Sequence, residues 1–260
     1  WVEKYRPTTL DDIILDERTL KQVKEFKEEI PNLLFVGNPG TGKTTLARII
    51  VNDVLGCNYL YINASDESGI DAIRHSITNF AQTKSFDGKV KVVILDEADG
   101  LTTQAQSALR NTMETYAKYC RFILTANYKH KIIPALQSRC QALDIKPVVE
   151  LAVKRCYNIL KDEKITVPEE QKKKFVQLVK RHFPDLRKTI NELQKNIIDS
   201  ELCIVSVTGD NELLEAVYKK IASKNSLEAR KYLIENEDRF QGDYDTLLGN
   251  FLNFIYSINI

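Results

Sequence analysis

A glycine-rich segment has the residue types of a phosphate-binding loop. Residues 37–45 read GNPGTGKTT and fit the pattern GxxxxGK(S/T). In this motif backbone N–H groups surround an oxyanion, the lysine neutralises β- and γ-phosphate charge, and the hydroxyl serves Mg²⁺. The sequence therefore predicts a nucleoside triphosphate site. The residues expected to form it are Gly37, Asn38, Pro39, Gly40, Thr41, Gly42, Lys43, Thr44 and Thr45.

Polar side chains follow two later apolar runs, where they could act on the same phosphates. Asp96 and Glu97 come directly after residues 90–95, and Asn127 follows residues 120–125. We expect Asp96, with Thr44, to hold Mg²⁺, and Glu97 to orient and deprotonate the attacking water. Asn127 could sense the γ-phosphate or hold that water. The segment TANYKH is no NKxD-like element of the kind a GTPase uses, which favours ATP.

The elements that must position these groups are short apolar or alternating runs separated by helical stretches. Strands alternating with helices imply an α/β fold with a parallel sheet covered on both faces. Five strands are expected at 32–37, 58–63, 90–95, 120–125 and 141–145, with helices near 42–55, 69–83, 103–117 and 130–138.

The chain after Pro147 is expected to be helical. Apolar residues recur at helical spacing over 149–163, 168–181 and 185–199, which predicts a small three-helix domain. Residues 209–260 predict two or three further amphipathic helices that pack on partners. The expected domains are thus 1–146, 147–208 and 209–260.

Composition excludes several classes of protein. The chain has 37 Lys+Arg and 36 Asp+Glu, 43% hydrophobic residues and 28% charged ones, which is ordinary globular composition and excludes disorder. No apolar run approaches the ~18 residues of a membrane span, and a soluble intracellular protein without a membrane partner is expected. The five cysteines and three histidines lack the spacing of a disulfide framework or zinc site. With a net charge of +1, any nucleic-acid contact must come from local patches.

Several segments together resemble one known family. They are WVEKYRP (1–7), TLDDII (9–14), GNPGTGKTT, INASDESGI (62–70), ILDEADGLTTQAQSALRNTME (94–114), FILTAN (122–127), LQSRC (136–140) and FPDLRKTINELQ (183–194). This series is similar to AAA+ ATPase subunits of sliding-clamp loaders, of the replication factor C small-subunit type. TNFAQTKSFDG (78–88) resembles its phage branch. The resemblance covers about 190 residues and thins out after 208.

The resemblance implies a RecA-like AAA+ domain with a five-stranded parallel sheet, a three-helix lid and a helical collar. It further implies a five-subunit assembly with ATP at subunit interfaces. ATP binding would hold open a ring-shaped clamp, and primer–template DNA would trigger hydrolysis and release. The location implied is cytoplasm or nucleoid, or the nucleus in a eukaryote.

Individual residues take roles from the same resemblance. Asn127 matches the first sensor, Arg139 in SRC the arginine finger that acts on a neighbour's ATP, and Arg187 the second sensor. The segment that covers adenine corresponds to Tyr5, Arg6, Pro7, Ile13 and Ile14.

DNA and clamp contacts are also implied. The DNA backbone would meet hydroxyls, helix N-terminal amides and arginines, at Ser65, Ser68, Gly69, Ile70, Arg74 and Arg110. Many relatives place a basic residue where this chain has Ser68. Phe80 and Phe86 are candidates for insertion into the clamp, with ordinary core packing as the alternative.

Two other readings of the motifs stay open. One is an AAA+ subunit that binds ATP but serves mainly as an assembly part, against which Lys43, Asp96, Glu97 and Arg139 argue. The other is a hexameric helicase or remodeller, for which no convincing pore loop is present. The string DEAD at 96–99 is attributed to coincidence, because no second motor domain follows.

Overall fold

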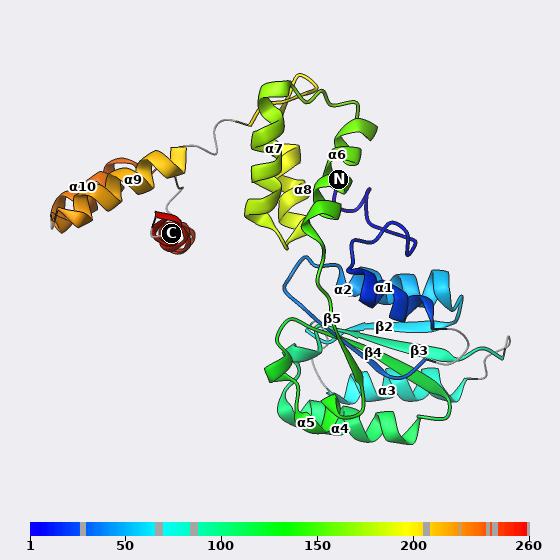
Figure 1. Cartoon of the computed structure of the whole chain (residues 1–260). Coiled ribbons are helices and arrows are strands. Elements are labelled where there is room, and N and C mark those ends of the chain that lie inside the picture. The colour runs from blue at the N-terminus through cyan, green and yellow to red at the C-terminus, as the bar shows by residue number, and fades with distance from the viewer. Residues whose placement is uncertain are drawn as a thin grey trace.

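A sheet-based unit is followed by two groups of helices in the computed structural model of the chain (Figure 1). The structure describes residues 1–26, 30–65, 70–83, 88–204, 209–223, 225–237, 240 and 244–258. Within these ranges no helix is both long and apolar enough to cross a membrane.

All five predicted strands are present and form one parallel sheet. They are β1 (Leu33–Val36), β2 (Tyr59–Asn63), β3 (Lys91–Asp96), β4 (Cys120–Ala126) and β5 (Gln141–Asp144). Their order is β2-β3-β4-β1-β5. The carboxyl ends of β1, β3 and β4 are therefore neighbours, which gathers the phosphate loop, Asp96 and Asn127 at one edge.

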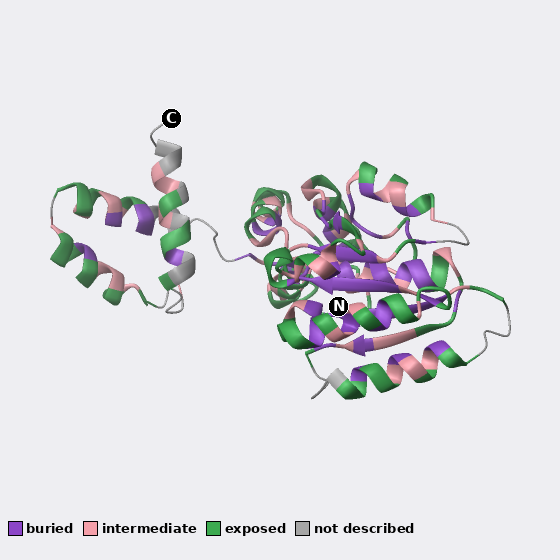
Figure 2. Ribbon diagram, turned by 90° about the horizontal axis from the view of Figure 1, so that it is seen from below, coloured by how far each residue is buried: buried purple, intermediate pink, exposed green. Residues whose placement is uncertain are grey.

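Both faces of the sheet are buried under helices. Leu33 and Phe35 belong to the hydrophobic cluster on one face, and Leu34 and Val36 belong to the cluster on the other, as the two-residue period of a strand requires. Figure 1 shows α1 (Glu17–Lys24) and α2 (Lys43–Ile49) on the first face, and α3 (Ile70–Gln82), α4 (Thr103–Thr115) and α5 (Pro134–Gln137) on the second. Buried residues concentrate in the strands between them (Figure 2).

The helices of this unit differ from expectation in two places. α1 was not predicted. The helix predicted at 130–138 is wrong in extent: a 3₁₀ turn at Lys129–Lys131 precedes the single turn of α5, since Pro134 fits only at a helix start. The π-helical turn Ile50–Val54 continues α2.

Three helices follow the sheet, as the periodicity predicts. They are α6 (Val149–Asp162), α7 (Glu169–His182) and α8 (Leu186–Lys195), and their core includes Cys156, Phe175 and Leu193. The expectation that the third helix runs to residue 199 is wrong. A short hairpin of β6 (Ile197–Ile198) and β7 (Glu201–Leu202) follows, with Asp199 and Ser200 in the left-handed conformation that two-residue hairpin turns require.

The last described segments form three helices with a small core of their own. They are α9 (Gly209–Ala222), α10 (Ser226–Glu235) and α11 (Tyr244–Ile258). Leu213, Leu214, Val217 and Leu247 are buried at their contact. Leu248 and Leu252, one helical turn apart on α11, are exposed.

Candidate functional site

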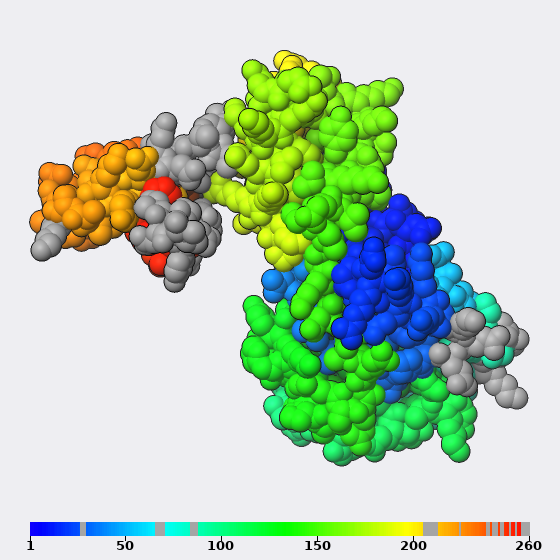
Figure 3. Space-filling view, in the orientation of Figure 1, coloured from blue at the N-terminus to red at the C-terminus, as the bar shows by residue number. Residues whose placement is uncertain are grey.

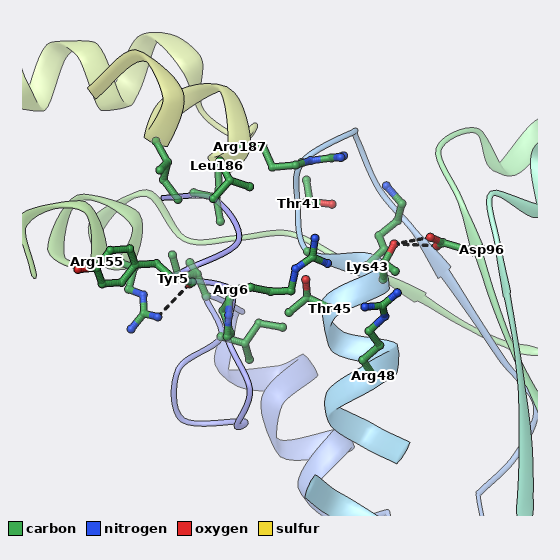
Figure 4. Close-up of a pocket in the computed structure, with 18 of the residues that line it drawn as sticks. Tyr5, Arg6, Thr41, Lys43, Thr45, Arg48, Asp96, Arg155, Leu186 and Arg187 are labelled. Atoms are coloured by element: carbon green, nitrogen blue, oxygen red, sulfur yellow. Dashed lines mark hydrogen bonds between the residues drawn. The ribbon is translucent and has the colours of Figure 1, made fainter. Parts of the chain in front are cut away.

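A pocket lies where the phosphate loop, the N-terminal segment and the first turn of α8 meet (Figure 4). Its floor comes from residues 40–45, and Asp96 and Glu97 lie at one end. Tyr5, Arg6 and Pro7 form a side wall with Ile13 and Ile14, and Arg187 enters from α8. In space-filling view the dark-blue N-terminal segment bridges the sheet unit and the helices above it (Figure 3).

The glycines of the loop allow close approaches that other residues could not make. Gly40 and Gly42 have φ of 75° and 93°, in the left-handed region. A Cβ on Gly40 would lie 1.9 Å from Asp185 Oδ1, and one on Gly37 would lie 2.7 Å from the Ile145 carbonyl oxygen. Leu186 N–H donates to the Gly40 carbonyl at 3.2 Å. The conformation of the loop thus exposes its backbone amides, and the start of α8 packs against the outer side of the loop.

Lys43 is held at the centre of the loop. It is only 8% exposed, and its Nζ donates to the carbonyls of Gly37 and Asn38 at 2.8 and 2.9 Å and to Asn127 Oδ1 at 2.8 Å. Burial lowers the pKa of Lys43, which Asp96 partly opposes. A buried ammonium of this kind is stabilised most by a negatively charged ligand. The bond to Asn127 also joins the loop to the end of β4.

Asp96 is surrounded by hydroxyl donors. Thr44 Oγ1 donates to both carboxylate oxygens at 2.7 and 2.9 Å. Thr125 Oγ1 donates to Oδ1 at 2.6 Å, and Tyr61 OH donates to Oδ2 at 2.8 Å. Burial, followed by this bond, raises the pKa of Tyr61 to about 12, so the phenol remains a donor at neutral pH.

Glu97 is held at the sheet edge in an unusual conformation. Its φ is 56°, which is uncommon for a residue with a side chain. Its N–H donates to Thr125 Oγ1 at 3.0 Å, and its Oε2 accepts from Ser65 Oγ at 2.8 Å. The carboxylate therefore lines the pocket within hydrogen-bonding reach of the end of β2.

The N-terminal wall is fastened to the helices rather than to the sheet alone. Tyr5 OH donates to Glu163 Oε1 at 2.7 Å, and Lys4 pairs with the same carboxylate at 2.5 Å. Arg155 donates to the Tyr5 carbonyl at 3.2 Å and pairs with Asp12 at 3.3 Å. Trp1 packs against the core of α6–α8.

The two arginines expected to act on phosphates occupy different places. Arg187 lines the pocket, and Figure 4 shows it reaching over the loop beside Thr41. Arg139 does not line this pocket. It pairs with Glu114 on α4 and donates to the Ala135 carbonyl at 2.9 Å, with 37% of its side chain exposed. The Arg139 guanidinium thus lies outside the pocket of its own chain and is partly exposed.

The residues predicted for DNA and clamp contact are only partly described. Ser65 bonds Glu97, Arg74 is exposed and pairs with Asp71 at 3.8 Å, and Arg110 bonds its neighbour Asn111. Ser68, Gly69 and Phe86 lie outside the described residues, as does the side chain of Ile70. Phe80 is half-buried on α3 below the Lys91 ammonium. These roles stay predictions.

Sequence reasoning missed several residues of the site. Arg48 and Tyr61 line the pocket, and Thr125 supports both Asp96 and Glu97. Asp99 Oδ2 accepts the N–H groups of Asn127 and Tyr128, each at 3.1 Å, which fixes the loop after β4. Arg48 lies one helical turn after Thr44, so the 3.6-residue period was a usable signal for it. The others depend on strand pairing.

The residues present fit ATP and Mg²⁺. The loop has the open backbone of a phosphate cradle, with Lys43 buried at its centre. Thr44 and Asp96 supply the hydroxyl and carboxylate oxygens that Mg²⁺ prefers. The wall of Pro7, Ile13 and Ile14 offers an apolar surface for a base.

Comparison with known proteins gives consistent matches. The model of the ATPase family associated with various cellular activities (AAA) matches residues 33–147, and that of the sliding-clamp-loader large subunit, AAA+ ATPase lid domain, matches residues 144–202. The replication factor C small subunit of Archaeoglobus fulgidus is 39% identical over 258 residues, covering 94% of this chain and 79% of the relative. Replication factor C subunit 3 of Blastobotrys adeninivorans is 40% identical, with 90% and 69% covered.

Solved structures show the same fold at lower identity. A variant of Thermotoga maritima RuvB has a TM-score of 0.53 and 18% identity, and the match covers 89% of this chain and 91% of that one. This likeness supports the architecture of an AAA+ fold.

Proposed function

Given that this chain belongs to the replication factor C small-subunit family of AAA+ ATPases, we propose that it binds Mg²⁺-ATP in the pocket under α8. It is an ATPase subunit of a DNA sliding-clamp loader. The observation that carries the proposal is one pocket uniting Lys43, Thr44, Asp96 and Glu97.

Each group has a distinct part in the proposed reaction. Lys43 neutralises the β- and γ-phosphates, and Asn127, already bonded to Lys43, lies beside the γ-phosphate. Mg²⁺, held by Thr44 and Asp96, would neutralise charge on the phosphate oxygens. Glu97 accepts the proton of the attacking water. Arg187 reaches the γ-phosphate from α8, and Tyr5, Arg6 and Pro7 with Ile13 and Ile14 cover the base.

Arg139 completes the site of a neighbouring subunit in this proposal. It is absent from the lining of its own pocket, and a guanidinium is suited to phosphoryl charge in the transition state. Hydrolysis therefore requires an interface. The proposed assembly has five subunits, which hold a ring-shaped clamp open and release it on primer–template DNA inside the cell.

The wider parts of the proposal follow the family. DNA phosphates meet Ser65, Ser68, Gly69, Ile70, Arg74 and Arg110, and the clamp meets Phe80 and Phe86. The proposed domains are an ATPase unit at 1–146, a lid at 147–208 and a collar at 209–260. Separate hydrophobic clusters in α6–α8 and in α9–α11 support this division.

Nucleotide binding tests the pocket. Lys43→Ala removes a charge-assisted contact to the phosphates, so a fluorescent ATP analogue should lose tight binding. Lys24→Ala is the matched control, because Lys24 is an exposed lysine on α1 paired with Asp11 at 3.3 Å. Equal affinity in the two variants would remove the assignment of the loop.

Hydrolysis tests the base. Glu97→Gln keeps the shape of the side chain but loses the proton acceptor, so ATP should still bind while turnover falls about 10²-fold or more. Steady-state turnover at the wild-type rate would show that another group activates the water.

Mixing tests the shared site. A finger acting across an interface is worth about 10³ to 10⁵ in rate. Arg139→Ala should therefore leave ATP binding unchanged but abolish turnover of the assembly. Arg18→Ala is the control and should change neither, because Arg18 is an exposed residue on α1. Co-assembled Arg139→Ala and Lys43→Ala subunits should regain some turnover at interfaces that pair an intact finger with an intact loop. Co-assembly without any turnover would contradict the shared site.

A further inference from the structure

A tyrosine and an arginine beside Asp96 have no part in the proposed reaction so far. Tyr61 lies on β2, the edge strand next to β3, and its hydroxyl donates to Asp96 Oδ2 at 2.8 Å. Arg48 lies on α2, and its guanidinium covers the Tyr61 ring at 4.7 Å from the centroid. Both line the nucleotide pocket.

The sheet places the Tyr61 hydroxyl on a defined carboxylate oxygen. Asn63 pairs with Asp96 across β2 and β3, and Tyr61 is two residues earlier on the same strand. Its side chain therefore lies on the same face of the sheet as that of Asn63. Thr125 of β4 holds Oδ1 from the other side. Two strands thus fix one oxygen each, independently of Thr44.

Helix geometry places Arg48 on the tyrosine ring. Arg48 follows Thr44 by four residues, so the two share one face of α2, and side chains on a helix lean toward its N-terminus. Figure 4 shows the Arg48 guanidinium on the side of the pocket where Asp96 lies. Its Nε is buried without a hydrogen-bond partner among the described residues. Arg48 therefore meets Tyr61 in two ways, through the contact of its guanidinium with the ring and through its positive charge, which partly opposes the rise in the pKa of Tyr61.

We propose that Tyr61 is a positioning residue that orients Asp96 for Mg²⁺, and that Arg48 acts through Tyr61 by holding its ring in place. The proposal rests on the proposed Mg²⁺-ATP site and adds two residues to it. Groups that orient a metal-binding carboxylate typically change metal affinity 10–100-fold when they are lost. The affinity for nucleotide without metal depends instead on the loop and Lys43.

The test separates metal affinity from nucleotide affinity. The affinity of the protein for a non-hydrolysable fluorescent ATP analogue is titrated over a range of Mg²⁺ concentrations and also in EDTA. Tyr61→Phe keeps the ring and loses only the hydroxyl, so the Mg²⁺ concentration for half-maximal effect should rise about 10-fold. Affinity in EDTA should not change. Tyr59→Phe is the matched control, because Tyr59 is on the same strand and does not line the pocket.

A double variant tests the role of Arg48. Arg48→Met should raise the Mg²⁺ requirement in the wild-type background and add nothing in the Tyr61→Phe background, since both changes act on one pathway. Additive effects, or weaker binding of the analogue in EDTA, would overturn the role given to Arg48. The role given to Tyr61 is overturned if its variant matches wild type in Mg²⁺ dependence or loses affinity in EDTA.

The outcomes also separate this inference from the proposed function. A wild-type protein whose analogue binding ignores Mg²⁺ would contradict the metal site itself. A wild type that responds to Mg²⁺, together with an unaltered Tyr61→Phe response, would contradict only the positioning role. The affinity for Mn²⁺ can also be measured directly, because bound Mn²⁺ loses the electron paramagnetic resonance signal of the free ion. The wild type and the variants should show the same order of metal affinities in this measurement.

Discussion

Replacing Thr125 by valine should destabilise the sheet unit by about 2–4 kcal/mol. Thr125 is 1% exposed, and its hydroxyl serves two partners, since it donates to Asp96 Oδ1 at 2.6 Å and accepts the N–H of Glu97 at 3.0 Å. A hydrogen bond to a charged group contributes about 1.5–3 kcal/mol, and the part-buried bond from the Glu97 amide adds about 1 kcal/mol. Valine fills nearly the same space, so little of the loss comes from packing.

Urea unfolding followed by circular dichroism measures this loss, with Thr112→Val as the control. Thr112 is also buried, but its hydroxyl donates only to the Ala108 carbonyl one turn earlier in α4, at 3.1 Å. Its replacement should cost less than about 1 kcal/mol, because that bond competes with the helix's own. Equal losses in the two variants would refute the idea that Thr125 supports the two carboxylate residues.

Three further outcomes are expected. Gly40→Ala should weaken nucleotide binding and cost about 1–3 kcal/mol of stability, because the added Cβ would meet Asp185, the N-cap of α8. Gly88→Ala is the control, because Gly88 has a φ of 66° and open space around it, so this variant should show the backbone strain alone. Equal losses of stability in the two variants would contradict the contact with Asp185. Burial, aided by Lys188, lowers the pKa of His182, so the unfolded state binds the proton first and stability falls as pH drops below about 6.5. His182→Gln should reduce that fall, as measured by unfolding titrations at several pH values. An unchanged pH profile of stability would refute this role of His182. Burial raises the pKa of Cys140 and of Cys156 to about 12. Iodoacetamide at pH 8 should therefore label both thiols at least about 10²-fold more slowly in the folded protein than in urea, as followed by mass spectrometry. Comparable labelling rates in the two conditions would count against this effect of burial.

The parts of the site that come from one continuous segment could be predicted from the sequence. The phosphate loop is identified from residues 37–45, and the strand before Asp96 contains four consecutive apolar residues, Val92 to Leu95. Their meeting at one sheet edge follows from parallel topology. The long helices α6 and α7 could also be predicted from the sequence, because each repeats apolar residues over several turns.

The remaining features depend on pairing and on weak local signals. Tyr61 and Thr125 reach Asp96 only because β2 and β4 flank β3, and this order cannot be read from any single segment. The helix α1 has only two apolar residues among its eight, Leu20 and Val23, which were too few to indicate a helix by repetition. The contact of Gly40 with Asp185 joins residues far apart in the chain.

The N-terminal segment adds a further attachment between α6–α8 and the sheet unit, through Lys4, Tyr5 and their partners Glu163 and Arg155. The other attachments are the covalent link after β5 and the hydrogen bond from Leu186 to Gly40. A body held at several points keeps fewer rotational degrees of freedom than one on a single hinge. A rotation of these helices relative to the sheet unit would therefore also move the wall beside Pro7, which lines the pocket. In the proposed site, the covering of the base and the angle of the helices are thus mechanically coupled.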